Sequence, residues 1–439
     1  MSERLGTQLQ PGGLEQSIHT GLLGKGLFAG ASLDLYFAVT KNIGPLVTFT
    51  RASSGTYVDS AGVLQTAATD VPRFDHNPTT GEGLGLLVEE ARTNSIRNST
   101  GVGAVAGTPG TLPTNWSTFT SLTGLTRQIV GTGTENGISY LDVKLSGTPS
   151  AAGSYFLQFE TSTSVAASNG QTWTSSGYFK LAGGSLTGIT TRNIAVALRD
   201  SGGGELGRVA TAFTPTSSDI ITQRVQATVT NNNASTTAQL NYIELVLSGV
   251  AIDITLRIGL PQLEQGASAT SPILTSTAAA TRAADVPSIT GSAFSSWYRQ
   301  DEGTLFAIGS TKGVTGSSAL IQFDDTTISE RIGLRRTQTQ DRLACIIVDG
   351  GTTQANNFIA SPAFIDGATG RCALAFASND VNISFNGALA TLDTTATMPT
   401  VTQATIGIGV GASYINNCIS RITYWPQRLS DSTLQSLTQ

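Results

Sequence analysis

The sequence predicts an all-β chain made of several β-sandwiches, with an extended arm at its N-terminus. Glycine accounts for 49 of the 439 residues and charged residues for only 13%, which is typical of short strands joined by many turns. Apolar and polar residues alternate with period two in many short segments, most clearly over Ile252–Ile258. No amphipathic helical pattern separates these segments, which favours sandwiches or jelly rolls.

The chain length and the net charge limit the number of domains and the class of partner. A chain of 439 residues is too long for one ordinary core, so two or three domains are expected. The net charge is −5, the pI is near 5.2 and no basic run occurs. A broad nucleic-acid-binding surface is therefore not expected.

Residues 1–45 form the expected N-terminal arm. Leu14–Leu23 could form a short helix with Leu14, Ile18 and Leu22 on one face. Two interpretations stay open, a tether into a larger assembly and a segment packed on the first domain. Residues 21–32 are too short and too rich in glycine to span a bilayer, and no signal peptide is visible, so no membrane insertion is expected.

Residues 46–112 are expected to hold short strands followed by a linker. Residues 59–62 (DSAG) and 77–81 (NPTTG) are turn signals between short apolar segments. The stretch from about 99 to 113 consists mostly of Gly, Ala, Thr and Pro and indicates a loop or linker.

Residues 113–275 are expected to form the first large β domain. Its strand candidates are Ile138–Leu145, Tyr155–Phe159, Trp173–Lys180, Ile194–Leu198, Arg224–Val229, Ile243–Leu247 and Ile252–Ile258.

Residues 276–292 are expected to be a linker that echoes an earlier segment. Thr50–Ala52 recurs as Thr281–Ala283, and Asp70–Pro72 recurs as Asp285–Pro287. This similarity suggests that both segments are edge strands of the same kind, in which proline blocks pairing with a further strand.

Residues 293–439 form the expected last domain. A turn is expected at Asn386–Gly387, and Ser430 is a good N-cap for a short helix that carries Leu434 and Leu437. Trp297 is expected to open a strand. The strand candidates are Ala319–Phe323, Ala344–Val348, Ala373–Phe376, Val381–Phe385 and Thr405–Val410.

Three groups of motifs resemble known families. FTRAS, TYVDSAGV, DVPRFDH and EEARTN, within residues 49–98, resemble a leader found in many tailed-phage virion proteins. LRIGLPQLEQGASATSPILTS resembles the end of jelly rolls of the carbohydrate-binding-module type in such proteins. EGTLF, VNISFNG and ISRITYWPQRLSD resemble concanavalin A-like, or laminin G-like, sandwiches.

The resemblance implies a structural protein on the exterior of a phage particle, assembled in the host cytoplasm. Such a protein is a spike, fibre or decoration that contacts capsid, portal or tail proteins through its arm, and appendages of this kind are frequently homo-trimers. Its sandwiches would adhere weakly to host-surface glycans and gain strength from many copies. The alternatives are a capsid-stabilising cement protein without a ligand and a glycan-degrading tail spike. The short apolar strands of the leader lack an obvious core and suggest a self-association surface.

No catalytic set, metal site or cofactor site is expected. His76 follows Asp75, but no serine or cysteine is marked as a partner, so a structural histidine in a turn is favoured. Glu89–Glu90 is more simply a strand edge or an ion-pair partner of Arg92 than a glycosidase pair.

The cysteines do not suggest a metal site either. Cys345, Cys372 and Cys418 lie among apolar neighbours without a C-x-x-C motif. Buried free thiols are therefore favoured over a disulfide or metal site.

Sugar binding is the chemistry that the sequence leaves open, because lectin sites stack an aromatic ring on a sugar and add Asn, Asp or Gln. Trp116 and Tyr414 lie in loop-like sequence, and Tyr140 and Asn416 are further candidates. Trp173 and Trp425 lie in alternating segments, where core packing is favoured. Asp324–Asp325 is more simply a hairpin turn than a calcium site.

Overall fold

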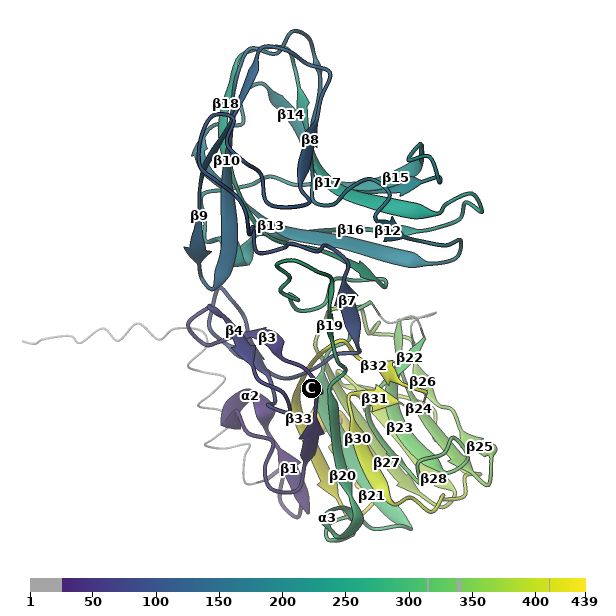
Figure 1. Ribbon diagram of the computed structural model, residues 1–439. Coiled ribbons are helices and arrows are strands. Elements are labelled where there is room, and N and C mark those ends of the chain that lie inside the picture. Colours follow the sequence, from purple (N-terminus) through teal and green to yellow (C-terminus); the bar gives the residue numbers. More distant parts are fainter. Residues whose placement is uncertain (1–25, 314–315, 338–340, 410) are drawn as a thin grey trace, which may run out of the picture.

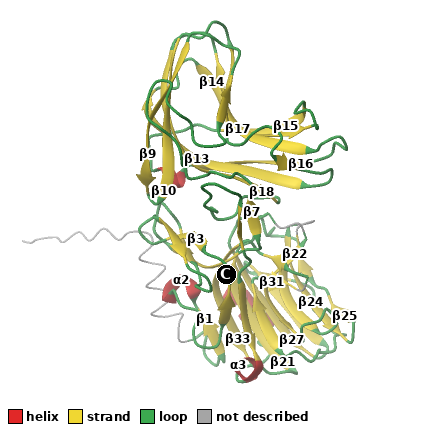
Figure 2. Cartoon of the chain, viewed as in Figure 1, coloured by secondary structure: helices red, strands yellow, loops and turns green. Residues whose placement is uncertain are grey.

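The computed structural model describes residues 26–313, 316–337, 341–409 and 411–439, so the helix expected over Leu14–Leu23 lies outside the described residues. Figure 1 shows two β-sandwiches, an upper one built from the middle of the chain and a lower one built from both ends. Strands dominate and helices are few and short (Figure 2). The predicted all-β, multi-sandwich fold is therefore confirmed. No helix among the described residues is long and apolar enough to cross a membrane.

The upper sandwich, hereafter the jelly roll, consists of two antiparallel sheets. One has the order β16 (Arg224–Thr230), β13 (Thr172–Gly184), β18 (Ile252–Gln265), β10 (Ile138–Gly147) and β9 (Leu125–Glu135). The other has the order β15 (Glu205–Ala212), β14 (Ile189–Arg199), β17 (Ala238–Leu247), β11 (Gly153–Gln158) and β8 (Ser117–Phe119), with β12 (Val165–Ala166) paired to β17. A 3₁₀ turn, η1, covers Ile220–Thr222. The seven segments predicted here each fall on a strand, because period-two alternation marks the face that each strand turns to the core.

The lower sandwich, hereafter the C-terminal sandwich, also has two sheets. The first has the order β29 (Ala388–Leu389), β28 (Asp380–Phe385), β27 (Gly370–Ala377), β21 (Glu302–Gly309), β33 (Asn417–Trp425), β6 (Gly83–Val88) and β5 (Phe74–His76), and β1 (Leu33–Leu35) also pairs with β33. The second has the order β2 (Thr48–Thr50), β20 (Val286–Thr290), β30 (Gln403–Ile406), β22 (Ser317–Asp324), β23 (Arg331–Thr337), β24 (Arg342–Asp349) and β25 (Thr352–Ala355), with β26 (Phe358–Ile359) paired to β24.

Small elements join the sandwiches or cover their ends. The two-stranded pairs are β3 (Gly55–Val58) with β4 (Leu64–Ala67), β7 (Arg92–Asn94) with β19 (Ala280–Arg282), and β31 (Ile408–Gly409) with β32 (Ser413–Tyr414). The helices are α2 (Phe37–Thr40), α3 (Gly291–Ser295) and α4 (Asp431–Thr438).

The leader completes the C-terminal sandwich. Leu87 pairs with Cys418, and Phe49 pairs with Pro287. Apolar residues of the leader, including Phe49 and Val88, are buried in the same core as the last domain. The leader strands therefore do have a core, contrary to the premise for a self-association surface there, because their partners lie at the other end of the chain.

The N-terminal arm and the linker also belong to this sandwich. The described part of the arm packs on it, with Phe28 stacked on Trp425 at 5.9 Å between ring centroids. The expected linker 276–292 contains β19 and β20. β20 lies between β2 and β30 and is therefore not the edge strand that its proline suggested. The C-terminal sandwich thus comprises residues from both ends of the chain, with the jelly roll inserted between them (Figure 1).

Several local predictions in this sandwich are confirmed. Ser430 caps α4, its hydroxyl accepting a hydrogen bond from the Thr433 N–H. Asn386 and Gly387 both have positive φ, as the predicted tight turn requires. The three cysteines are free and buried, and burial raises the pKa of each thiol. Trp297 is buried, but it follows α3 and does not open a strand.

Candidate binding groove between the two sandwiches

A buried cluster of charges joins the leader, the end of the jelly roll and β19–β20. This ionic clasp consists of Arg51, Arg73, Arg282, Glu89 and Asp285, all at most 2% exposed. Arg51 pairs with Asp285 at 3.0 Å, and Arg73 pairs with Glu89 at 2.8 Å and also with Asp285. Arg282 pairs with Glu89 at 3.2 Å. The clasp explains the sequence echo, since Arg51 and Arg282 occupy equivalent motif positions and converge on one site.

Polar groups from the jelly roll complete the clasp. The Ser271 N–H and Oγ–H donate to the two oxygens of Glu89, each at 2.7 Å. Burial opposes ionisation of this carboxyl, but Arg282, Arg73 and the two bonds from Ser271 outweigh it and lower the pKa of Glu89 to about 2. A buried carboxylate held in this way stays charged, so the clasp locks the jelly roll to the C-terminal sandwich at neutral pH.

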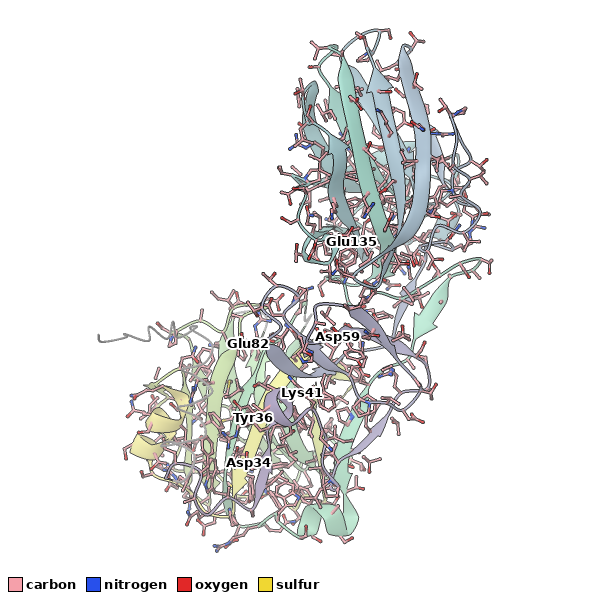
Figure 3. All side chains as sticks on the ribbon, turned by 90° about the vertical axis from the view of Figure 1, so that its left-hand side faces the viewer. Asp34, Tyr36, Lys41, Asp59, Glu82 and Glu135 are labelled. Atoms are coloured by element: carbon pink, nitrogen blue, oxygen red, sulfur yellow. The ribbon has the colours of Figure 1, made fainter. Side chains whose placement is uncertain are left out.

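The β3–β4 hairpin of the leader makes a second contact with the jelly roll. The Leu64 N–H donates to the Asn136 carbonyl at 2.9 Å, and Leu64 packs with Ile138 and Tyr178. Gly137 permits the approach, since it has positive φ and a Cβ there would lie 2.2 Å from the Leu64 carbonyl oxygen. Figure 3 shows this side, with Glu135 at the lower end of the jelly roll and Asp59 on the hairpin beneath it.

Together these contacts frame a groove of about 620 Å³ between the sandwiches. One wall comes from the end of the leader and from β19, and the other comes from β13 and the end of β18. The residues on the groove are mainly polar or glycine: Glu90, Ala91, Arg92, Thr93, Ser95, Gly170, Gln171, Thr172, Trp173, Gln265, Gly266, Ala267 and Thr281. Its volume is within the ordinary range of small-ligand sites.

Hydrogen-bonding groups that suit hydroxyls line the groove. Thr93 and Thr281 share a hydrogen bond of 2.7 Å across β7 and β19. The Trp173 indole N–H donates to Gln171 Oε1 at 3.2 Å, which fixes the amide beside the ring. Gln265 is exposed at the end of β18. Hydroxyl and amide groups of this kind both donate and accept, as sugar hydroxyls do.

Glu90 is the carboxylate of the groove and is held on both sides. The Arg92 guanidinium donates to Glu90 Oε1 at 2.5 Å, and the Asn416 amide donates to the same oxygen at 2.7 Å. The predicted pairing of Glu90 with Arg92 is therefore confirmed. Arg92 fits because it lies over Gly266, where a Cβ would come within 1.5 Å of its nearest nitrogen. The ion pair leaves the groove close to neutral.

Two of the predicted ligand residues lie in a smaller cleft next to the groove. Tyr414 and Asn416 line a volume of about 190 Å³ together with Glu90, which borders both spaces. The Asn416 side chain accepts from the Glu90 N–H at 2.9 Å and so couples this cleft to the groove. Burial raises the pKa of Tyr414, which therefore stays neutral and can donate a hydrogen bond.

The other two predicted ligand residues are not open for stacking. Trp116 is 7% exposed, packs edge-on against Phe159, and its indole N–H donates to the Asn98 carbonyl at 2.8 Å. The loop-like sequence around it suggested exposure, but the ring fills the jelly-roll core. Tyr140 lies beside the leader hairpin, and the Arg257 guanidinium is 3.5 Å from its ring centroid. One ring face is therefore occupied.

The sequence did not identify the groove itself. Trp173 was interpreted as core, and the structure shows it both in the jelly-roll core and at the edge of the groove. Nothing in the sequence marked Arg92, Gln265 and Thr281 as residues of one binding site, because they become neighbours only when the two sandwiches meet. His76 is at the end of β5 rather than in a turn, and its Nδ1 lies 2.9 Å from the Val58 carbonyl oxygen. Over the described part of the chain, no group of three or more His, Cys, Asp or Glu residues is placed to hold a metal ion.

Comparison with known proteins gives partial likenesses to solved structures. No protein-family model matches the chain, and no curated protein matches it. The CBM40 of the Ruminococcus gnavus IT-sialidase, bound to α2,6 sialyllactose, is similar at 15% identity and a TM-score of 0.28 over 32% of this chain and 85% of that one. Domain 4 of the arabinanase AbnA from Geobacillus stearothermophilus, in complex with arabinotriose, is similar at 11% identity and a TM-score of 0.28, over 39% and 82%.

A whole enzyme is among the similar structures. The NanB sialidase from Streptococcus pneumoniae is similar at 15% identity and a TM-score of 0.29, but the match covers 34% of this chain and 26% of the sialidase. Since each match leaves most of this chain uncovered, we draw nothing from them about its ligand or activity.

Proposed function

We propose that this chain is a structural, non-catalytic protein on the exterior of a tailed-phage virion, and that its groove binds a neutral glycan of the host surface. The observation that carries the proposal is the make-up of the groove, with hydroxyls, amides and one neutralised carboxylate beside Trp173. A neutral, hydroxyl-rich ligand matches these groups. Binding at one site is weak, and display of many copies strengthens adhesion.

The groove does not favour hydrolysis. Glycosidases use two carboxyl groups on opposite sides of the scissile bond. Among the described residues on the groove, Glu90 is the only carboxylate, and it is paired with Arg92. The alternative function, a glycan-degrading spike, is tested by an activity assay. Release of reducing ends from a glycan by the wild-type chain, and its loss in Glu90→Gln, would support the glycan-degrading spike.

The virion location rests on the leader. Residues 49–98 resemble leaders of virion proteins, and their charged residues build the clasp. A rigid mount of this kind suits a module that must keep its orientation on a particle. Capsid, portal or tail proteins are the proposed partners of the N-terminal segment, and a homo-trimer is the proposed assembly.

Binding is tested with the full chain on an array of neutral and acidic glycans, followed by calorimetry on the best neutral ligand. Glu90→Gln and Gln265→Ala should each weaken binding by about tenfold, because each removes a groove hydrogen bond. Gln427→Ala, an exposed glutamine at the end of the C-terminal sandwich, is the matched control. Equal affinities for all variants would refute the groove as the site.

Location is tested by cryo-electron microscopy of the intact particle. Density for this chain at capsid positions with the N-terminus toward the shell supports a head spike or decoration, and density at the tail supports a receptor-binding spike. Flat array signals together with loss of capsid stability on deletion would favour the cement protein instead. Sedimentation equilibrium of the purified chain tests the trimer.

A further inference from the structure

Three arginines lie in a row on the outer face of the second C-terminal sheet. On β23, Ile332 and Leu334 point into the core, so Arg331 and Arg335 belong to the opposite face. Arg342, on β24, pairs with Thr337 and is therefore the diagonal neighbour of Arg335 on that face. We refer to Arg331, Arg335 and Arg342 as the arginine row.

The arginine row forms no ion pair among the described residues, although Asp324 lies opposite Arg331 in the sheet. No carboxylate oxygen among the described residues lies within 4.0 Å of its guanidinium groups, although most other described arginines have such a partner. Among the described residues, its guanidinium groups make a single protein hydrogen bond, from Arg335 Nη2 to Asn356 Oδ1 at 3.1 Å. The Nε of each of the three is buried without a partner.

An Nε without a partner is not peculiar to the row, since Arg73 and Arg428 also have one. What distinguishes the row from its neighbours in the sheet is the lack of an ion pair. The neighbouring Arg336, on the core side of β23, donates to the Phe364 carbonyl at 2.6 Å and also contacts Asp341 and Asp366. Asp324, the nearest carboxylate along the row, already accepts from Gln322 and Gln403 at 2.7 and 2.6 Å. The row therefore presents guanidinium donors that the described part of the chain does not use.

Burial makes these donors costly to leave unused. Burial lowers the pKa of Arg331, and the charge of Asp324 offsets part of this effect. Burial also lowers the pKa of Arg335, and the charge of Arg331 lowers it further. A donor without an acceptor destabilises the fold when it is buried, and more so when it is charged. The three side chains are half-buried, so an external oxyanion would reach their Nη groups, which are not among the buried unpartnered atoms.

We propose that the arginine row binds an acidic saccharide, with its carboxylate or phosphate groups paired to the guanidinium groups. Arg331 and Arg335 are four residues apart on one strand, about 13 Å, and Arg342 adds roughly 7 Å on the diagonal. This spacing suits an extended chain that carries more than one anion.

A ring surface for the sugar lies at the end of the row. Phe358 is 49% exposed. The Arg342 guanidinium lies 3.6 Å from its ring centroid and covers one face, so a sugar would meet the other face. Since the groove between the sandwiches is close to neutral, the arginine row is a second site with a different ligand. The proposal for the arginine row does not depend on the proposal for the groove.

The experiment measures binding of defined probes to the full chain by calorimetry. The probes are a trimer of galacturonic acid, its methyl ester, inorganic phosphate and a short oligothymidylate. The acid trimer should bind, its uncharged ester should bind at least tenfold more weakly, and the affinity should fall steeply between about 50 and about 500 mM salt. Arg331→Gln with Arg335→Gln should reduce the affinity for the acid by more than tenfold, and Arg342→Gln by less.

The controls separate the arginine row from general charge and from the groove. Arg299→Gln removes the same charge from an exposed arginine that pairs with Asp301, and it should leave binding unchanged. Gln265→Ala changes the groove without changing its charge and should also leave acid binding to the row unchanged, so failure here and failure of the groove are distinguishable. The salt dependence of the wild-type affinity for the acid trimer tests the proposal even if the double variant does not fold.

The outcomes that overturn the proposal are distinct. Equal binding of acid and ester would show that charge is irrelevant. Phosphate that competes as well as the trimer would mean a site for an isolated anion rather than a saccharide. Oligothymidylate that binds more tightly than the trimer through the same arginines would assign the row to nucleic acid.

Discussion

Replacing Glu89 by glutamine removes the central charge of the clasp while keeping the side-chain shape. Its pKa is lowered from 4.5 to about 2 in the folded chain, and 1.36 kcal/mol per unit gives a loss of about 3 kcal/mol at neutral pH. This value agrees with the loss of about 3–5 kcal/mol in unfolding free energy that typically follows removal of one partner of a buried ion pair. Glu89→Gln should therefore lower the free energy of unfolding by about 3 kcal/mol at pH 7.

The pH dependence gives the same reasoning a second readout. Because the folded pKa of Glu89 is lowered, its stabilisation is present above about 4.5 and is lost as the pH falls towards about 2. The difference between wild type and Glu89→Gln should therefore be constant from pH 5 upwards and shrink in acid.

Urea unfolding followed by tryptophan fluorescence reports on both sandwiches, since Trp116 and Trp173 lie in the jelly roll and Trp297 and Trp425 in the C-terminal sandwich. Glu90→Gln is the matched control. Glu90 is adjacent in sequence, but its side chain is 33% exposed, so the expected loss is below about 1 kcal/mol. Equal losses for the two variants, or a Glu89→Gln deficit that persists in acid, would refute the reasoning.

Three further predictions follow from buried groups and close contacts. Burial raises the pKa of Asp75 to about 6. The stability of the wild type relative to Asp75→Asn should therefore fall as the pH rises from about 4 to about 6, and the variant should be more stable by up to about 3 kcal/mol at pH 7. Urea midpoints of the two proteins that keep a constant difference over this pH range would contradict the prediction. Gly85→Ala should destabilise by more than about 2 kcal/mol in thermal unfolding, because φ is +117° and the added Cβ would lie 2.0 Å from the Ile419 carbonyl oxygen; an unchanged melting temperature would rule this out. Ser430→Ala should cost about 1 kcal/mol through loss of the α4 cap, with Ser430→Asp as the conservative rescue.

The clasp gives the leader motifs a structural role. Arg51, Arg73 and Glu89 belong to the TRA, DVPRFDH and EEARTN segments, and all three are buried between the sandwiches. The same segment then supplies Glu90 and Arg92 to the groove. One short stretch of sequence therefore fixes the jelly roll in place and forms a wall of the candidate site.

Local sequence determined the strands, turns and caps of this protein. Period-two alternation marked the strands of the jelly roll, Asn386–Gly387 marked a hairpin turn, and Ser430 marked the start of α4. Each of these features depends on residues within a few positions of one another, so neighbouring residues carry the necessary information.

Only the tertiary structure decided which strands pair and where ligand groups gather. Leu87 pairs with Cys418, so the leader belongs to the last sandwich, although nothing in its local pattern indicates that partner. The groove joins β7 and β19 to β13 and β18. The arginine row is recognisable only from the three-dimensional placement of the described residues around it. Pairing across long sequence separations depends on matching surfaces, which alternation within one strand does not encode.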